Sequence, residues 1–248
     1  MSPKATTTSD RFARVISTPA GLDATLATIC YTSLLLHTQF SNSRTPSRLA
    51  NLSPAFRNLY NLLEDTRVYT RLTGLVALYT AIRETWAIRQ HDVVSDILLR
   101  SSLLAVTTYQ VLENIALLVQ HNVLRSRRLK PWEGWFWTTS NRFWLAALFC
   151  DLARLARARQ LGFEDDSVVA GNDAATEEGH ESLSQVENVV NLLRKQWWQE
   201  LLMTAASLPM AVNWSFAEGE SPVNETLVAG AGLVGGLIML KDAVKDAL

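Results

Sequence analysis

The residue types that most often carry chemistry lie far apart in this 248-residue chain. Cys30 and Cys150 stand alone, which fits a reducing compartment and packing as small apolar residues. The sequence contains no glycine-rich phosphate loop, dinucleotide-binding fingerprint or nucleophile elbow. The histidines lack the spacing of metal ligands; they are His37, His91, His121 and His180. We therefore expect no enzyme activity, no metal and no cofactor.

An arginine-rich stretch at 47–86 offers a different chemistry, that of a surface. Its apolar residues recur at intervals of three and four, so they share one face of an α-helix. The first five are Leu49, Leu52, Phe56, Leu59 and Leu63. After a step of five residues the stripe continues with Val68, Leu72, Leu75, Tyr79, Ile82 and Trp86. The pattern predicts one long amphipathic helix.

The positions from 44 to 89 hold seven arginines against three acidic residues, a net charge of +4. A basic amphipathic helix suits an anionic membrane surface or the groove of a partner. In the membrane interpretation the stripe inserts among lipids, and the residues that meet headgroups are Arg48, Arg57, Arg67 and Arg71. The alternative is a helix whose stripe lies in a bundle core and whose arginines lie in water.

Composition and charge divide the rest of the chain. Mean hydropathy is +0.06 with 19% charged residues, which is high for a soluble protein and low for a polytopic transporter. The net charge of −1 conceals a segregation, because residues 163–188 contain eight acids and no Lys or Arg. We predict a helical region over 1–161, an acidic flexible linker over 162–188 and a membrane region over 189–248. No nucleic-acid partner is expected.

Tryptophans gather beside a basic cluster in the middle of the chain. The cluster is Arg125, Arg127, Arg128 and Lys130, and the tryptophans are Trp132, Trp135, Trp137 and Trp144. This composition is typical of a membrane interface. A tryptophan-rich packing corner between helices explains it equally well.

The C-terminal region predicts a hydrophobic helical hairpin. Residues 201–217 and 226–240 carry no charge, although each is short of the roughly 30 Å hydrocarbon core as a helix. The loop between them is acidic, and basic residues flank the pair at Arg194, Lys195, Lys241 and Lys245. The positive-inside rule then places both flanks in the cytosol. Gly232 and Gly236 form a GxxxG surface for close helix packing. A buried soluble hairpin is the alternative.

Four blocks of the sequence resemble the peroxin-eleven family of peroxisomal membrane-elongation proteins, as a divergent fungal member. The first runs from Thr18-Pro19-Ala20-Gly21-Leu22-Asp23 to Tyr31, and the second is Thr66–Gly74 with Arg67 and Arg71. The third combines Tyr109-Gln110-Val111-Leu112-Glu113-Asn114 with Asn141-Arg142-Phe143-Trp144 and Arg154. The fourth is Leu208-Pro209-Met210-Ala211-Val212-Asn213-Trp214-Ser215 with the glycine-rich run after it.

The resemblance implies an all-α, membrane-associated helical bundle in the peroxisomal membrane, with both termini cytosolic. It also implies that the amphipathic helix curves and elongates the membrane and so promotes peroxisome fission and proliferation. The partners implied are membrane lipids, further copies or paralogues of the chain, and a dynamin-type fission machinery. Two alternatives remain open: a helical adaptor on the cytosolic face and a small pore, for which Glu113 and scattered amides are the candidate lining residues.

Overall fold

The computed structural model describes residues 8–41, 50–88, 91–162, 181–217 and 219–247. Within them it contains helices and connections but no strand, which confirms the all-α prediction. In chain order the helices are α1 (Thr8–Ser17), α2 (Pro19–Ser41), η1 (Ala50–Leu52), α3 (Ser53–Thr70), η2 (Arg71–Thr73), α4 (Gly74–Ala87), α5 (Val93–Gln120), η3 (Lys130–Trp132), α6 (Glu133–Leu161), α8 (Glu181–Trp214) and α9 (Glu225–Ala247).

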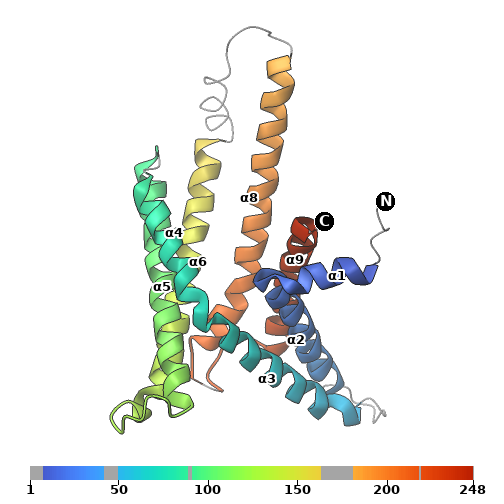
Figure 1. Cartoon of the computed structure of the whole chain (residues 1–248), viewed down its shortest axis with the longest axis vertical. Helices are drawn as coiled ribbons and strands as arrows, with labels where there is room; N and C mark the ends of the chain where they lie inside the picture. The colour runs from blue at the N-terminus through green and yellow to red at the C-terminus, as the bar shows by residue number, and fades with distance from the viewer. Residues whose placement is uncertain (1–7, 42–49, 89–90, 163–180, 218, 248) are drawn as a thin grey trace, which may run out of the picture.

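The helices form two arms joined by α3 and α8 (Figure 1). One arm pairs α2 with α9, and the other pairs α5 with α6 and carries α4 on its outside. Helix α8 contacts both α6 and α9, while α3 packs along α2 and then turns through η2 into α4. The hydrophobic core lies in the first arm, where Cys30, Tyr31 and Leu34 of α2 meet Tyr60 of α3. Met210, Val228 and Ala229 complete this core from α8 and α9.

The predicted helix over 47–86 is two helices rather than one. A 3₁₀ turn, η2, separates α3 from α4, and the chain changes direction there (Figure 1). The five-residue step in the apolar stripe signalled an interruption nearby, but the pattern did not show a bend. Leu49 and Arg48 lie outside the described residues, and so does the acidic segment 163–180. Helix α8 begins at Glu181, inside the range predicted as a linker.

Among the described residues three helices are long and apolar enough to cross a membrane, judged by length and composition: α2, α5 and α9. The predicted hairpin is present as α8 and α9, which pack together. Only its second helix is among these candidates. About 20 apolar residues are needed to span a bilayer as a helix. Sequence reasoning did not identify α2 and α5 as candidate spans.

Local signals explain where several helices begin. Thr18 and Pro19 start α2, and the Thr18 hydroxyl accepts a hydrogen bond from the Gly21 amide at 3.0 Å. Asp92 caps α5, because its carboxylate accepts from the amide of Ser95 at 2.9 Å.

Candidate functional site at the junction of the two arms

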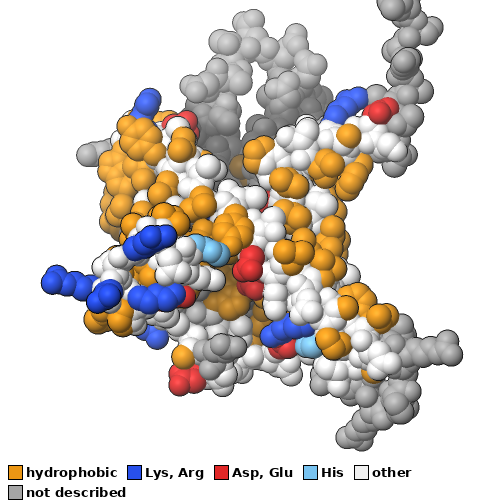
Figure 2. Space-filling model, turned by 60° about the horizontal axis from the view of Figure 1, so that its bottom comes forward, with side chains coloured by type: hydrophobic (Ala, Val, Ile, Leu, Met, Phe, Trp, Pro, Cys, Tyr) orange, Lys and Arg blue, Asp and Glu red, His pale blue; other side chains and the backbone are white. Residues whose placement is uncertain are grey.

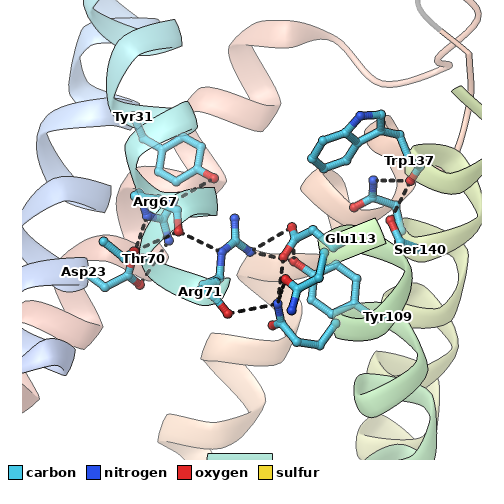
Figure 3. A network of polar contacts seen from close by, with 12 residues as sticks. Asp23, Tyr31, Arg67, Thr70, Arg71, Tyr109, Glu113, Trp137 and Ser140 are labelled. Atoms are coloured by element: carbon cyan, nitrogen blue, oxygen red, sulfur yellow. Dashed lines mark hydrogen bonds and ion pairs between the residues drawn. The ribbon is translucent and has the colours of Figure 1, made fainter. Parts of the chain in front are cut away.

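Arg67 of α3 ties that helix to α2. Its guanidinium donates to both oxygens of Asp23, with Nε 2.7 Å and Nη2 3.2 Å from them. Nη1 lies 3.5 Å from the hydroxyl of Tyr31 (Figure 3). A bidentate arginine–carboxylate pair fixes orientation as well as distance. Arg67 therefore sets how α3 lies against α2.

Arg71, one turn further along, reaches across to α5. Its Nη1 donates to the hydroxyl of Tyr109 at 2.6 Å and lies 3.5 Å from the carboxylate of Glu113 (Figure 3). Tyr109 in turn donates to Glu113 at 2.8 Å, and Gln110 donates to the other carboxylate oxygen at 3.3 Å. Glu113 is only 4% exposed, so its charge depends on these donors.

The stretch of α5 that contains Tyr109 and Glu113 also stabilises the bend between α3 and α4. A break in a helix leaves backbone carbonyls without their usual partners. Gln110 donates to the carbonyl of Arg71 at 3.2 Å, and Asn114 donates to the carbonyl of Leu72 at 3.4 Å. Gly74 follows directly, and a Cβ there would lie 3.4 Å from the Gln110 side chain. The bend is thus built jointly by η2 and α5.

Stacked aromatic rings continue the junction towards α8. The ring of Trp144 on α6 stacks on Tyr109 with centroids 6.0 Å apart and on Trp214 with centroids 5.8 Å apart. Beside this stack Arg142 donates to the backbone carbonyl of Ser215 at 3.1 Å. All four sequence blocks therefore meet at one place: Asp23 comes from the first, Arg71 from the second, Tyr109 from the third and Trp214 from the fourth.

A cavity of about 910 Å³ lies beside this junction. Residues from both arms line it, with charged groups on α3 and α5 and tryptophans on α6 and α8. Glu64 of α3 faces it, and burial raises the pKa of this carboxyl although its contact with Tyr60 works in the other direction. Polar and charged residues of the lining include Asn61, Glu64, Arg67, Arg71, Glu113 and Asn141.

Three of the four arginines predicted to meet lipid headgroups, Arg57, Arg67 and Arg71, make ion pairs with other residues of the protein. Arg67 and Arg71 point to Asp23 and Glu113, and Arg57 pairs with Glu225 at the start of α9. Arg67 and Arg71 are turned inward because acidic partners lie on α2 and α5, whereas the pair of Arg57 and Glu225 is exposed. Contact of these side chains with headgroups stays a prediction.

The predicted leucine face is divided between surface and interior. Leu52 and Leu59 are exposed, whereas Phe56 packs against Phe40 and Leu63 packs against the core. Leu62, which was not selected from the sequence, is the most exposed leucine of α3 at 63%. The spacing from Leu59 to Leu62 to Tyr69 was the available signal, since these positions share a helix face.

Gly232 and Gly236 of α9 pack against α2 of the same chain. A Cβ on Gly232 would lie 2.4 Å from the ring of Tyr31, and one on Gly236 would lie 3.0 Å from the backbone of Thr28. Small residues let two helices approach in this way. The GxxxG pattern thus has a partner within the chain.

The tryptophans of the central region separate into two sets. Trp137 and Trp144 line the cavity, whereas Trp132 and Trp135 are 56% and 48% exposed. The basic residues Arg125, Arg127, Arg128 and Lys130 are exposed as well. The packing interpretation therefore holds for Trp137 and Trp144, and the membrane-interface interpretation of the exposed half stays a prediction.

Comparison with known proteins identifies the family. A family model described as Peroxisomal biogenesis factor 11 (PEX11) matches residues 9–244, nearly the whole chain. No curated protein and no solved structure gives a significant match. The chain therefore belongs to the PEX11 family, and so it is a protein of the peroxisomal membrane that takes part in peroxisome proliferation.

Proposed function

We propose that this protein elongates the peroxisomal membrane by inserting the outward face of α3 into one leaflet while the helix stays docked in the bundle. The observation that carries the proposal is the polarity of α3. Its exposed side chains include the apolar Leu59, Leu62 and Tyr69 beside the polar Asn58, Asn61 and Asp65, while Tyr60 and Arg67 face the protein. A helix that lies in water usually exposes its arginines rather than its leucines.

The energy of such insertion is sufficient for reversible binding. Full burial of a leucine side chain contributes about 1.5–3 kcal/mol, so three partly buried leucines contribute several kcal/mol. Insertion on one side expands that leaflet relative to the other and favours curvature. The ion pairs of Arg67 and Arg71 keep the helix fixed, so that its apolar face stays directed outward.

The remainder of the bundle supports placement in a membrane. Buried positions include polar residues of the candidate spans, such as Ser33 of α2 and Gln110 of α5. Large apolar side chains lie on the outside, and Figure 2 shows them spread over both arms. A protein surrounded by lipid buries its polar groups against one another in this way.

Both chain ends belong to one side of the bundle in this proposal. Helix α1 packs against α9, so the two terminal elements are neighbours (Figure 1). Arg194, Lys195, Lys241 and Lys245 lie on the helical stretches that flank the hairpin, and by the positive-inside rule the charges of the hairpin assign that side to the cytosol. The α5–α6 connection, which is basic as well, lies at the other end of the bundle (Figure 1), so this assignment rests on the hairpin charges alone. Association with further copies or paralogues and recruitment of a dynamin-type fission machinery complete the proposal.

The test is a double substitution on the exposed face, Leu59→Glu with Leu62→Glu, in cells that lack the native protein. We expect peroxisomes to stay few and large, while the protein stays in the membrane after carbonate extraction. Asn51→Glu with Asn58→Glu is the matched control, because it adds the same charge at exposed polar positions. Normal elongation with the leucine variant would refute the mechanism. Release of the wild type by carbonate would favour the adaptor function.

A second function, a small pore, is favoured by the cavity. Glu113, the acidic residue that the sequence analysis named as a candidate for a pore lining, does face the cavity together with Glu64, Asn61 and Asn141. The test is conductance of the full chain in planar bilayers, with and without Glu113→Gln. Conductance whose ion selectivity changes in the variant would support a pore, and absence of conductance would leave remodelling alone.

A further inference from the structure

The connection between α5 and α6, residues 121–132, carries exposed cations that the proposed function does not use. Arg125, Arg127 and Arg128 are exposed, and no ion pair among the described residues includes them. Lys130, also exposed, pairs with Glu133 at 2.5 Å. In Figure 2 basic side chains gather on one side of the end of the bundle that faces the viewer. Three positive charges of this connection are therefore not neutralised by ion pairs among the described residues, and they are accessible to an external partner.

Exposed apolar side chains lie directly beside these cations. Val123 is 66% exposed, and Trp132 and Trp135 contact each other edge to face with centroids 6.0 Å apart. The connection follows the end of α5, which is one of the candidate membrane spans. Tryptophan and arginine at the end of a span are the residues that occupy the boundary between hydrocarbon and water.

We propose that this connection binds the headgroups of anionic phospholipids at a bilayer surface, as a second lipid contact separate from α3. The arginines would donate to lipid phosphates and carboxylates, and Trp132 and Trp135 would lie at headgroup level. This inference rests on the membrane location in the proposed function but does not depend on remodelling by α3.

Charge complementarity alone would also admit the acidic stretch 163–188 of a second copy. In sequence that stretch follows α6 and includes the first turns of α8, and the end of α6 and the start of α8 lie at the end of the bundle opposite the α5–α6 connection (Figure 1). Two copies inserted alike in one membrane would therefore hold these charges on opposite faces. The anionic lipid surface, in contrast, lies at the same end of the bundle as the α5–α6 connection, so we infer that it is the acidic partner.

The test uses the full chain in nanodiscs of phosphatidylcholine with added phosphatidylserine. The readout is quenching of tryptophan fluorescence by brominated phosphatidylserine compared with brominated phosphatidylcholine. The variant W132F/W135F identifies the part of the signal that comes from the two exposed tryptophans. The variant R125Q/R127Q/R128Q removes the three charges. The control R11Q/R14Q/R83Q removes three other exposed arginines, from α1 and α4.

We expect the wild type to enrich phosphatidylserine at these tryptophans. R125Q/R127Q/R128Q should reduce the preference by about tenfold at low ionic strength and by less as salt rises. The control should stay within about twofold of the wild type. An unchanged preference in R125Q/R127Q/R128Q, or an equal loss in the control, would overturn the proposal. If instead L59E/L62E elongates peroxisomes normally, the remodelling mechanism fails while this lipid preference stands.

Discussion

Arg67 of α3 and Arg71 of η2 point into the protein, whereas Arg125, Arg127 and Arg128 of the α5–α6 connection point outward. Both regions appear in the sequence as arginines beside apolar residues, with the composition of a membrane-binding surface. They differ in whether a neighbouring helix places an acidic side chain opposite the arginines. Asp23 and Glu113 lie opposite the inward-pointing arginines, while no ion pair of the described residues involves the three of the connection. Composition alone thus does not distinguish an internal clamp from a surface.

The strongest test of this difference is to replace one arginine by methionine in each of the two regions and to compare the effects on stability. Arg71→Met leaves Glu113 buried without its cation, and we expect a loss on the order of 3 kcal/mol in the free energy of unfolding. Arg127→Met removes an exposed charge and should change stability by less than about 0.5 kcal/mol. Thermal unfolding in detergent measures both. Equal effects would mean that the contacts of Arg71 do not stabilise the junction.

Arg67 gives a second comparison within α3. Asp23→Asn and Arg67→Gln each remove one side of the bidentate pair, and a double-mutant cycle isolates their interaction. Because both side chains are mostly buried, we expect a coupling of about 1–3 kcal/mol. The same cycle on Lys130 and Glu133, a pair with an exposed lysine in the connection, should give less than about 0.5 kcal/mol. Additive effects at Asp23 and Arg67 would contradict the clamp.

Close packing of α9 on α2 supports the clamp indirectly, since Tyr31 contacts both Gly232 and Arg67. Gly232→Ala would place a methyl group against the Tyr31 ring, and we expect a loss of about 1–3 kcal/mol from forced repacking. Gly230→Ala is the matched control in the same helix, because a Cβ there meets no heavy atom within 4 Å. It should be neutral or slightly stabilising. Differential scanning fluorimetry in detergent would show whether the two variants separate.

We expect the smallest effect at the partly buried pair of Arg157 and Asp92, which lies outside both regions. Arg157 donates to Asp92 at 3.0 Å, and this contact together with the helix cap lowers the pKa of Asp92 below its usual range. A lowered pKa contributes stability above the unfolded value of about 4 and loses it as the pH falls below that value. Melting temperatures measured from neutral to acidic pH should therefore fall slightly less steeply in Asp92→Asn than in the wild type. Parallel curves would show that this pair is not linked to stability.

Local patterns were enough to determine the helical class, the start of α2 at Thr18 and Pro19, and the presence of the α8–α9 hairpin. Helix periodicity, capping residues and uncharged runs act over a few residues, so the sequence displays them directly. The four blocks that carry the family resemblance could also be found in the sequence, although nothing in it showed that Asp23, Arg71, Tyr109 and Trp214 meet at one junction.

Tertiary structure alone decided the direction in which each charged face points. The arginines of α3 were predicted to meet headgroups because an amphipathic pattern gives two faces but does not say which one is covered. That choice depends on Asp23 and Glu113, which are 44 and 42 residues away from Arg67 and Arg71. The bend at η2 was decided in the same way, since its freed carbonyls are satisfied by Gln110 and Asn114 of α5. A partner distant in sequence is the physical reason in each case.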